Sequence, residues 1–209
     1  MNNIIAFRQE CFDQINALLK NKALILLWGK SGSGKSVLLQ RLALYHSVLL
    51  QRLALYHNED FTNEIFTDEK DFHHFIQDKK RKIIILDEVG MYSPNVLELI
   101  RIYSDEMSFV LSSHKKINLF EEEYFKSRFS AIFWLQKPDI NELSNYIKMK
   151  FNQDFPQKSL KFLMKIYQGN LRYLDKILQS FCELNTYLNN KKSQDYILRL
   201  SALEQGFLK

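Results

Sequence analysis

The sequence predicts an α/β protein: a doubly wound parallel sheet of five strands, followed by a small all-α domain. Three observations support this prediction. Short apolar runs alternate with amphipathic stretches from the N-terminus to Leu135, the order of strands and helices that a parallel sheet requires. One of these runs leads directly into a glycine-rich loop. After Pro138 the strand-like runs stop, and only helical spacing of apolar residues remains.

The first domain, residues 1–137, begins with an amphipathic helix predicted at 4–19. The predicted strands are short apolar runs bounded by polar or turn residues, at 23–28, 65–67, 82–87, 109–111 and 131–135. Further helices are predicted behind the glycine-rich loop, at 69–80, at 94–104 and at 121–126. Ser93 and Pro94 are the N-cap and first-turn proline of the helix at 94–104.

The second domain, residues 138–209, follows the boundary at Pro138. Its predicted helices share apolar residues at helical spacing and lie at 139–151, 158–168, 171–188 and 193–206. Asp139 is the predicted N-cap of the first of these helices, and Gly169 ends the second. The sequence therefore predicts a helical lid after an α/β core.

The composition is that of a globular protein without a membrane span. The 209 residues contain no run of the roughly 18–20 apolar residues that a span needs, and the N-terminus lacks the pattern of a signal peptide. Cys11 and Cys182 lie far apart without metal-like spacing, as expected of thiols in a cytoplasmic protein. The net charge of +5 permits contact with nucleic acid or anionic lipid, although solvated helix faces explain most of the lysines.

The glycine-rich loop follows the strand at 23–28, and its sequence GKSGSGKS matches the phosphate-binding pattern GxxxxGK(S/T). The glycines let successive backbone N–H groups turn toward a phosphate. Lys35 supplies positive charge to the outer phosphates, and the Ser36 hydroxyl can bind Mg²⁺. The predicted phosphate-binding residues are Gly29, Lys30, Ser31, Gly32, Ser33, Gly34, Lys35 and Ser36.

A second motif, IIILDE at 83–88, ends a strand that is predicted to be buried on both faces. Asp87 stands at the C-terminal end of this strand, where it can hold Mg²⁺ through water beside Ser36. Glu88 follows directly and is placed to orient or deprotonate an attacking water. The alternative is that Glu88 only caps a helix or forms a salt bridge. A metal-binding acid followed by a base is typical of enzymes that hydrolyse nucleotides.

Three weaker features gain weight from their order along the chain. Ser112 and Ser113 close the strand after the acidic one and can contact a γ-phosphate, although serines there are more often turn residues. Arg128 stands just before the last strand, where it can reach the γ-phosphate of a neighbouring subunit. Arg172 begins a helix of the second domain and can fold over a bound nucleotide. Either arginine, taken alone, would be a solvated surface residue.

In this order and spacing, GKSGSGKS, IIILDE, the two serines, SRF at 127–129 and GNLR at 169–172 resemble the AAA+ ATPases over nearly the whole chain. The resemblance implies the roles of Walker A, Walker B, sensor 1, arginine finger and sensor 2, with ATP and Mg²⁺ as cofactors. Sensor 1 stays open between Ser112 and Ser113. The aromatic signature of a pore loop is not evident, so substrate threading is not predicted.

Two branches of that family are similar to this chain. One is the bacterial replication-initiator and regulator group, whose lids carry a GNxR-like motif. The other is the ExeA-like group of secretion, DNA-uptake and transposition ATPases, which LELIRIYSDEM, FVLSSHKKINLF and DINELSNYIKMKF resemble more. An initiator would add a helix-turn-helix domain after the lid, and no such pattern follows here. We therefore expect an accessory ATPase that relies on a partner for targeting.

The sequence thus predicts an ATP hydrolase with Lys35, Glu88 and Arg128 as catalytic residues. It would switch assembly of a larger machine, with a secretion or DNA-uptake (transformation) apparatus favoured. The alternatives are a DnaA-like replication regulator or transposition helper, and a non-catalytic ATP-gated binding module. Expected partners are further copies of the chain, at least transiently and through Arg128, and a protein of that machine. Direct DNA contact stays open, as does peripheral association with the inner face of the cell membrane through a partner.

Ser36 also begins a perfect tandem repeat, because SVLLQRLALYH occupies 36–46 and again 47–57. Eleven residues span about three helical turns, so the second copy faces within about 20° of the first. One continuous helix from Lys35 to Tyr56 is therefore predicted, with only the first copy directly behind the phosphate loop. The duplication has three interpretations: it is neutral, it damages helix packing and activity, or it is an adaptive extension that presents a leucine stripe to a partner.

Overall fold

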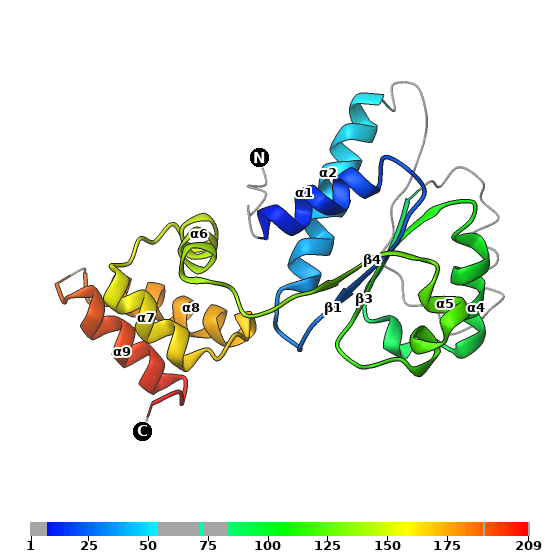
Figure 1. The fold of residues 1–209 in the computed structure, drawn as a ribbon. Coiled ribbons are helices and arrows are strands. Elements are labelled where there is room, and N and C mark those ends of the chain that lie inside the picture. The colour runs from blue at the N-terminus through cyan, green and yellow to red at the C-terminus, as the bar shows by residue number, and fades with distance from the viewer. Residues whose placement is uncertain (1–7, 54–71, 73–82, 190, 209) are drawn as a thin grey trace. The chain divides into compact units, whose positions relative to one another are not determined.

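The computed structural model describes residues 8–53, 72, 83–189 and 191–208, with the backbone alone for 47–53. The chain divides into two compact units (Figure 1). The sheet unit comprises Gln9–Lys30 and Lys35–Leu135. The helical unit comprises Arg8, Ser31–Gly34 and residues 136–208. Three described stretches of the chain thus belong to the helical unit: Arg8, the tip of the phosphate loop, and the residues after Leu135.

A parallel sheet forms the centre of the sheet unit. Its strands are β1 (Leu24–Trp28), β2 (Ile83–Leu86), β3 (Ser108–Ser113) and β4 (Phe129–Trp134), in the order β2-β3-β1-β4. All three pairings are parallel, which confirms the predicted class of sheet. The described residues hold four strands where five were predicted. The predicted strand at 65–67 and the predicted helix at 69–80 lie outside the residues that the structure describes, apart from the single residue Phe72.

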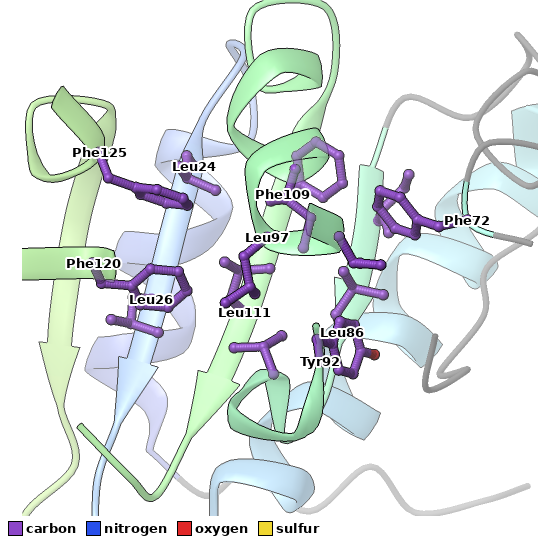
Figure 2. Packing of buried hydrophobic residues seen from close by; sticks show 14 of the residues in the cluster. Leu24, Leu26, Phe72, Leu86, Tyr92, Leu97, Phe109, Leu111, Phe120 and Phe125 are labelled. Atoms are coloured by element: carbon purple, nitrogen blue, oxygen red, sulfur yellow. The ribbon is translucent and has the colours of Figure 1, made fainter. Parts of the chain in front are cut away.

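Alternate residues of each strand are buried on opposite faces of the sheet, as a doubly wound fold requires. On β1, Leu24 and Leu26 join one core cluster, whereas Ile25 and Leu27 join the other. Figure 2 shows the first cluster, where η1 (Val89–Met91), α4 (Pro94–Tyr103), η2 (Asn118–Glu121) and α5 (Glu123–Lys126) cover the sheet. The second cluster lies under α1 (Gln9–Leu18) and α2 (Lys35–Leu53). Its largest contribution from α2 is a stripe of leucines, Leu38, Leu39 and Leu42.

The helices of the sheet unit lie close to their predicted positions. They are α1 (Gln9–Leu18), α2 (Lys35–Leu53), α4 (Pro94–Tyr103) and α5 (Glu123–Lys126), with the short 3₁₀ segments η1 (Val89–Met91) and η2 (Asn118–Glu121). Ser93 is the N-cap of α4, as predicted, because its side chain accepts a hydrogen bond from the Val96 N–H at 3.3 Å. The first part of the helix predicted at 4–19 lies outside the described residues.

Four helices form most of the helical unit, as predicted. They are α6 (Ile140–Phe151), α7 (Gln157–Ile166), α8 (Leu171–Tyr187) and α9 (Gln194–Glu204). Asp139 begins α6 with a capping box that is completed by Glu142. Gly169 has a φ of 84° between α7 and α8, a backbone conformation that favours glycine, and this explains the predicted stop. Along the described chain, no helix is both long enough and apolar enough to cross a membrane.

The tandem repeat begins as the predicted continuous helix. Helix α2 contains the whole first copy and residues 47–53 of the second, and the remainder of the second copy lies outside the described residues. The first copy packs on α1: the Arg41 guanidinium lies 3.7 Å from the centre of the Phe12 ring, and Tyr45 meets the same ring edge-on. The three interpretations of the duplication therefore stay open.

Candidate active site

The phosphate loop joins β1 to α2, where the sequence places it. Gly29 follows β1, and its N–H donates to the carbonyl of Ser113 on β3 at 3.3 Å. Gly32 and Gly34 have φ values of 78° and 94°, which a residue with a side chain rarely adopts. The glycine spacing of the motif is therefore a backbone requirement of this turn. Helix α2 begins at Lys35, so its N-terminal N–H groups and the positive end of its dipole lie at the loop.

Lys35 is buried, with 4% of its surface exposed. Its ammonium group donates to the carbonyl oxygens of Gly29 at 2.8 Å and Lys30 at 3.1 Å. The side chain thus folds back along the first half of the loop and brings its charge to the phosphate-binding backbone. Ser36 lies half-buried in the first turn of α2. Ser33 contributes a buried hydroxyl that has no hydrogen-bond partner among the described residues.

The tip of the loop, Ser31–Gly34, is held by residues of the helical unit. The Leu171 N–H, at the start of α8, donates to the Gly32 carbonyl at 2.8 Å. The Arg8 guanidinium donates to the Ser33 carbonyl at 3.3 Å and pairs with Glu142 at 3.1 Å. It also donates to the backbone carbonyl of Gln136. These contacts tie the loop tip to the N-termini of α6 and α8.

Gly32 lies against the residue that caps α8. Asn170 is this N-cap, and its Oδ1 accepts from the Arg172 N–H at 3.0 Å. A Cβ placed on Gly32 would lie 2.0 Å from that same oxygen, far closer than non-bonded atoms approach, so the Asn170 side chain would have to move. Arg172 itself is exposed in the first turn of α8. The helical unit therefore brings the GNLR segment to the loop tip through backbone contacts.

One further side chain lies close to the charges of Arg8 and Glu142. Tyr167 is almost completely buried, and its hydroxyl has no hydrogen-bond partner among the residues described. Burial is the main cause that raises the pKa of Tyr167 to about 12; Arg8 opposes this shift and Glu142 adds to it. The hydroxyl is therefore neutral at physiological pH. We assign it to packing, because a buried neutral phenol supplies no charge to the loop.

The acidic motif lies at the C-terminal end of β2, beside the end of β3. The Ser112 hydroxyl donates to Asp87 Oδ1 and accepts from the Glu88 N–H at 3.2 Å. The Ser113 hydroxyl instead closes its own turn, donating to the Lys115 carbonyl at 2.8 Å. Of the two serines that the sequence left open, the structure brings Ser112 to the acidic motif.

Glu88 has an unusual backbone for a residue with a side chain. Its φ and ψ are 51° and 46°, in the left-handed region. The Glu88 N–H is bonded to Asp87 Oδ1 at 3.1 Å and to Ser112, so contacts at the strand end hold this conformation. Its carboxylate Oε2 lies 2.5 Å from Nδ1 of His114. The sequence-based prediction missed His114, although its position just past the strand beside the acidic one was a usable signal.

Arg128 lies away from these residues. It directly precedes β4, whereas Gly29, Glu88 and His114 follow the C-terminal ends of their strands. Because all four strands are parallel, Arg128 lies at the opposite edge of the sheet. A six-residue strand such as β4 spans about 20 Å. Its guanidinium forms an ion pair with Asp105, and 39% of its side chain is exposed.

The residues at the C-terminal edge suit a nucleotide with Mg²⁺. Hydroxyl and carboxylate oxygens are the ligands that Mg²⁺ prefers, and Ser36 and Asp87 carry one of each. The loop supplies backbone N–H groups and a buried ammonium for phosphate oxygens.

Solved structures of known proteins share this fold. A variant of RuvB from Thermotoga maritima is similar with a TM-score of 0.67 and 17% identity, over 93% of this chain and 68% of RuvB. Domain III of the T. maritima replication initiation protein DnaA gives a TM-score of 0.62 and 18% identity, over 93% of this chain and 89% of that domain. RuvB and DnaA are AAA+ ATPases. This chain has the AAA+ fold. Orc1 from Aeropyrum pernix, in complex with DNA, also has it: the TM-score is 0.65 at 11% identity, over 95% of this chain and 65% of Orc1.

At these identities the likeness establishes the fold. No protein-family model and no curated protein sequence matches the chain. The AAA+ fold explains the arrangement of the site: the phosphate loop follows β1, and the acidic motif follows β2, which lies two strands away in the same sheet.

Proposed function

We propose that this protein binds ATP with Mg²⁺ and hydrolyses it. The observation that carries the proposal is that the phosphate loop, two acidic residues and a serine lie at the same edge of the sheet. The loop follows β1, and Asp87, Glu88 and Ser112 are joined by hydrogen bonds at the neighbouring strand ends. Phosphate binding would account for the loop but not for Glu88. Hydrolysis also accounts for a second acidic residue held next to Asp87.

Each residue has a role that follows from its place. Lys35 and the loop N–H groups bind phosphate oxygens and stabilise the negative charge that the transition state spreads over them. The Ser36 hydroxyl and the Asp87 carboxylate would hold Mg²⁺, which supplies charge neutralisation when it is bound. Glu88 orients the attacking water and accepts its proton. Ser112 fixes the Asp87 carboxylate and the Glu88 backbone.

Replacement of Lys35 by alanine is expected to weaken ATP binding by roughly 10- to 150-fold. The estimate follows from the 1.5–3 kcal/mol that a hydrogen bond to a charged group contributes. Titration calorimetry with Mg·ATP measures the change in Kd, and circular dichroism checks that the variant is folded. Lys20→Ala, at an exposed lysine after α1, is the matched control and should bind as the wild type does. Equal affinities of Lys35→Ala and the wild type would contradict the proposed phosphate site.

The machine that this ATPase serves is a further proposal. Among similar structures, Orc1 was solved in complex with DNA, and DnaA is a replication initiation protein. Both favour a machine that acts on DNA, so DNA uptake and replication control gain support over protein secretion. Binding of duplex DNA by this chain, weakening steeply with salt, would support direct contact. Binding that needs a second protein would instead favour the accessory role expected from the sequence.

We also propose that Arg128 acts on a neighbouring copy of the chain. The reason is geometric: Arg128 lies at the sheet edge opposite to its own phosphate loop, and an arginine cannot reach across the strands. In the free chain Asp105 neutralises it, so this ion pair must open when copies associate.

Arg128→Ala is therefore expected to abolish any rise of kcat with protein concentration, while ATP affinity stays unchanged. Turnover measured from nanomolar to tens of micromolar protein tests this, with Lys126→Ala as a control at an exposed cation two residues earlier. A wild-type kcat that does not depend on concentration, or a rise that persists in Arg128→Ala, would contradict a role in trans.

A further inference from the structure

We propose that His114 is a positioning residue for ATP hydrolysis: it holds the carboxylate of Glu88 on the side of the acidic strand that faces the phosphate loop. The inference rests on the proposed hydrolytic function and assigns a role to a residue that neither the motifs nor the family resemblance singles out. It starts from one contact, between His114 Nδ1 and Glu88 Oε2 at 2.5 Å.

Glu88 is held at both ends. Its backbone N–H is bonded to Asp87 Oδ1 and to the Ser112 hydroxyl, which fixes the left-handed conformation at the end of β2. Its side chain is bonded to His114, just past the end of β3. A glutamate has three rotatable side-chain bonds, and without the imidazole the carboxylate would sample several rotamers. The His114 contact therefore selects one direction for the carboxylate.

The topology of the sheet says which direction this is. The order is β2-β3-β1, so β3 lies between the acidic strand and the strand that leads into the phosphate loop. His114 follows β3, and a contact with it draws the Glu88 side chain toward the loop. The contact thus favours the orientation in which Glu88 can reach a water beside a bound γ-phosphate.

The chemistry of the contact leaves the base competent. A carboxylate has two oxygens and several lone pairs, so Oε2 can accept from the imidazole while Oε1 remains for the proton of water. Nδ1 carries a proton in one neutral tautomer of histidine and in the imidazolium ion, so either form can donate. Neither form requires a proton to move between the two residues.

A purely structural role does not explain the pair equally well. The side chains of His114 and Glu88 are 34% and 31% exposed, and pairs this accessible to water contribute little to the free energy of unfolding. If the contact served only stability, its loss would leave kcat unchanged in the folded protein. The positioning role instead predicts a loss in kcat with little change in stability.

The test compares steady-state ATP turnover of wild type, His114→Ala and His114→Asn, with the whole chain and saturating Mg²⁺. We expect His114→Ala to lower kcat by roughly 10- to 100-fold and to leave KM for ATP within about twofold, because a misplaced group loses rate without losing substrate binding. The Asn side chain places an amide N–H donor where Nδ1 stood, so His114→Asn should recover most of the rate. Lys116→Ala, in the same turn, is the matched control.

The Glu88→Gln background completes the test. If His114 acts through Glu88, then His114→Ala should lower the residual turnover of Glu88→Gln by less than twofold, because the two changes remove one function. Wild-type turnover that depends on Lys35 and Glu88 but is unchanged in His114→Ala would overturn the positioning role alone. An equal loss in the Glu88→Gln background would overturn it as well. Absence of any Lys35-dependent turnover in the wild type would overturn both this role and the proposed function.

Discussion

Replacement of Glu88 by glutamine is expected to lower kcat for ATP hydrolysis by about 10² to 10⁴, the usual contribution of a general base. The amide is nearly isosteric with the carboxylate, but it cannot accept a proton from the attacking water. The contacts that hold the residue go through its backbone N–H and through an oxygen that glutamine retains. The Kd for Mg·ATP should therefore stay within about threefold, since the phosphate loop is untouched.

The experiment measures turnover and binding on the same preparations. Glu122→Gln, at an exposed glutamate before α5, removes the same charge elsewhere and should leave both quantities unchanged. Should Glu88→Gln bind and turn over ATP like the wild type, Glu88 is not the base. If the wild type binds ATP without turnover, the alternative of a non-catalytic ATP-gated binding module is the better account.

The second large effect is expected at Gly32, where alanine should lower the free energy of unfolding by about 1.5–4 kcal/mol. Two costs add. An L-residue at a φ of 78° costs about 1–2 kcal/mol. The new Cβ would also lie 2.0 Å from Asn170 Oδ1 and displace that side chain from the Arg172 N–H. Loss of an N-cap costs about 0.5–2 kcal/mol.

Gly206→Ala separates the two costs. Gly206 has a nearly equal φ of 74°, but a Cβ there meets nothing within 4 Å. Urea unfolding should show a loss of about 1–2 kcal/mol for Gly206→Ala, from backbone strain alone, and a larger loss for Gly32→Ala. Equal losses in the two variants would mean that the loop tip does not contact Asn170. The same Gly32 variant should bind ATP more weakly, because its loop must rearrange.

The strands of the sheet unit could be predicted because a strand that is buried on both faces is a short, continuous apolar run in the sequence. The run predicted as a strand at 82–87 became β2 at Ile83–Leu86, and the run at 131–135 became β4 at Phe129–Trp134. The starts of helices could also be predicted where a side chain caps the helix through a local hydrogen bond, as at Ser93 and Asp139. Such signals depend on neighbours in the chain, so no knowledge of tertiary structure is needed.

The choice between Ser112 and Ser113 shows what the sequence left open. Successive residues of a strand face opposite sides, so Ser112 shares its face with Val110, which belongs to the cluster under α1 and α2. Ser113 shares its face with Phe109 and Leu111, under η1 and α4. Both serines look alike until it is known which face carries the helix that follows the phosphate loop.

Contacts between distant segments were beyond the sequence for the same physical reason. The pairs His114–Glu88 and Arg128–Asp105 join residues 26 and 23 positions apart, and the Arg8–Glu142 pair joins residues 134 apart. No local periodicity records such a pair. The phosphate loop was predicted as a binding site, but the hydrogen bond between its tip and the start of α8 depends on the fold of the helical unit.

The central claim, that this chain hydrolyses ATP at the phosphate loop, is tested most directly by the release of inorganic phosphate from ATP by the purified protein with and without Mg²⁺. We predict release that requires Mg²⁺ and is strongly reduced in both Lys35→Ala and Glu88→Gln. Release that is absent from the wild type, or that continues at the same rate in both variants, would contradict the claim.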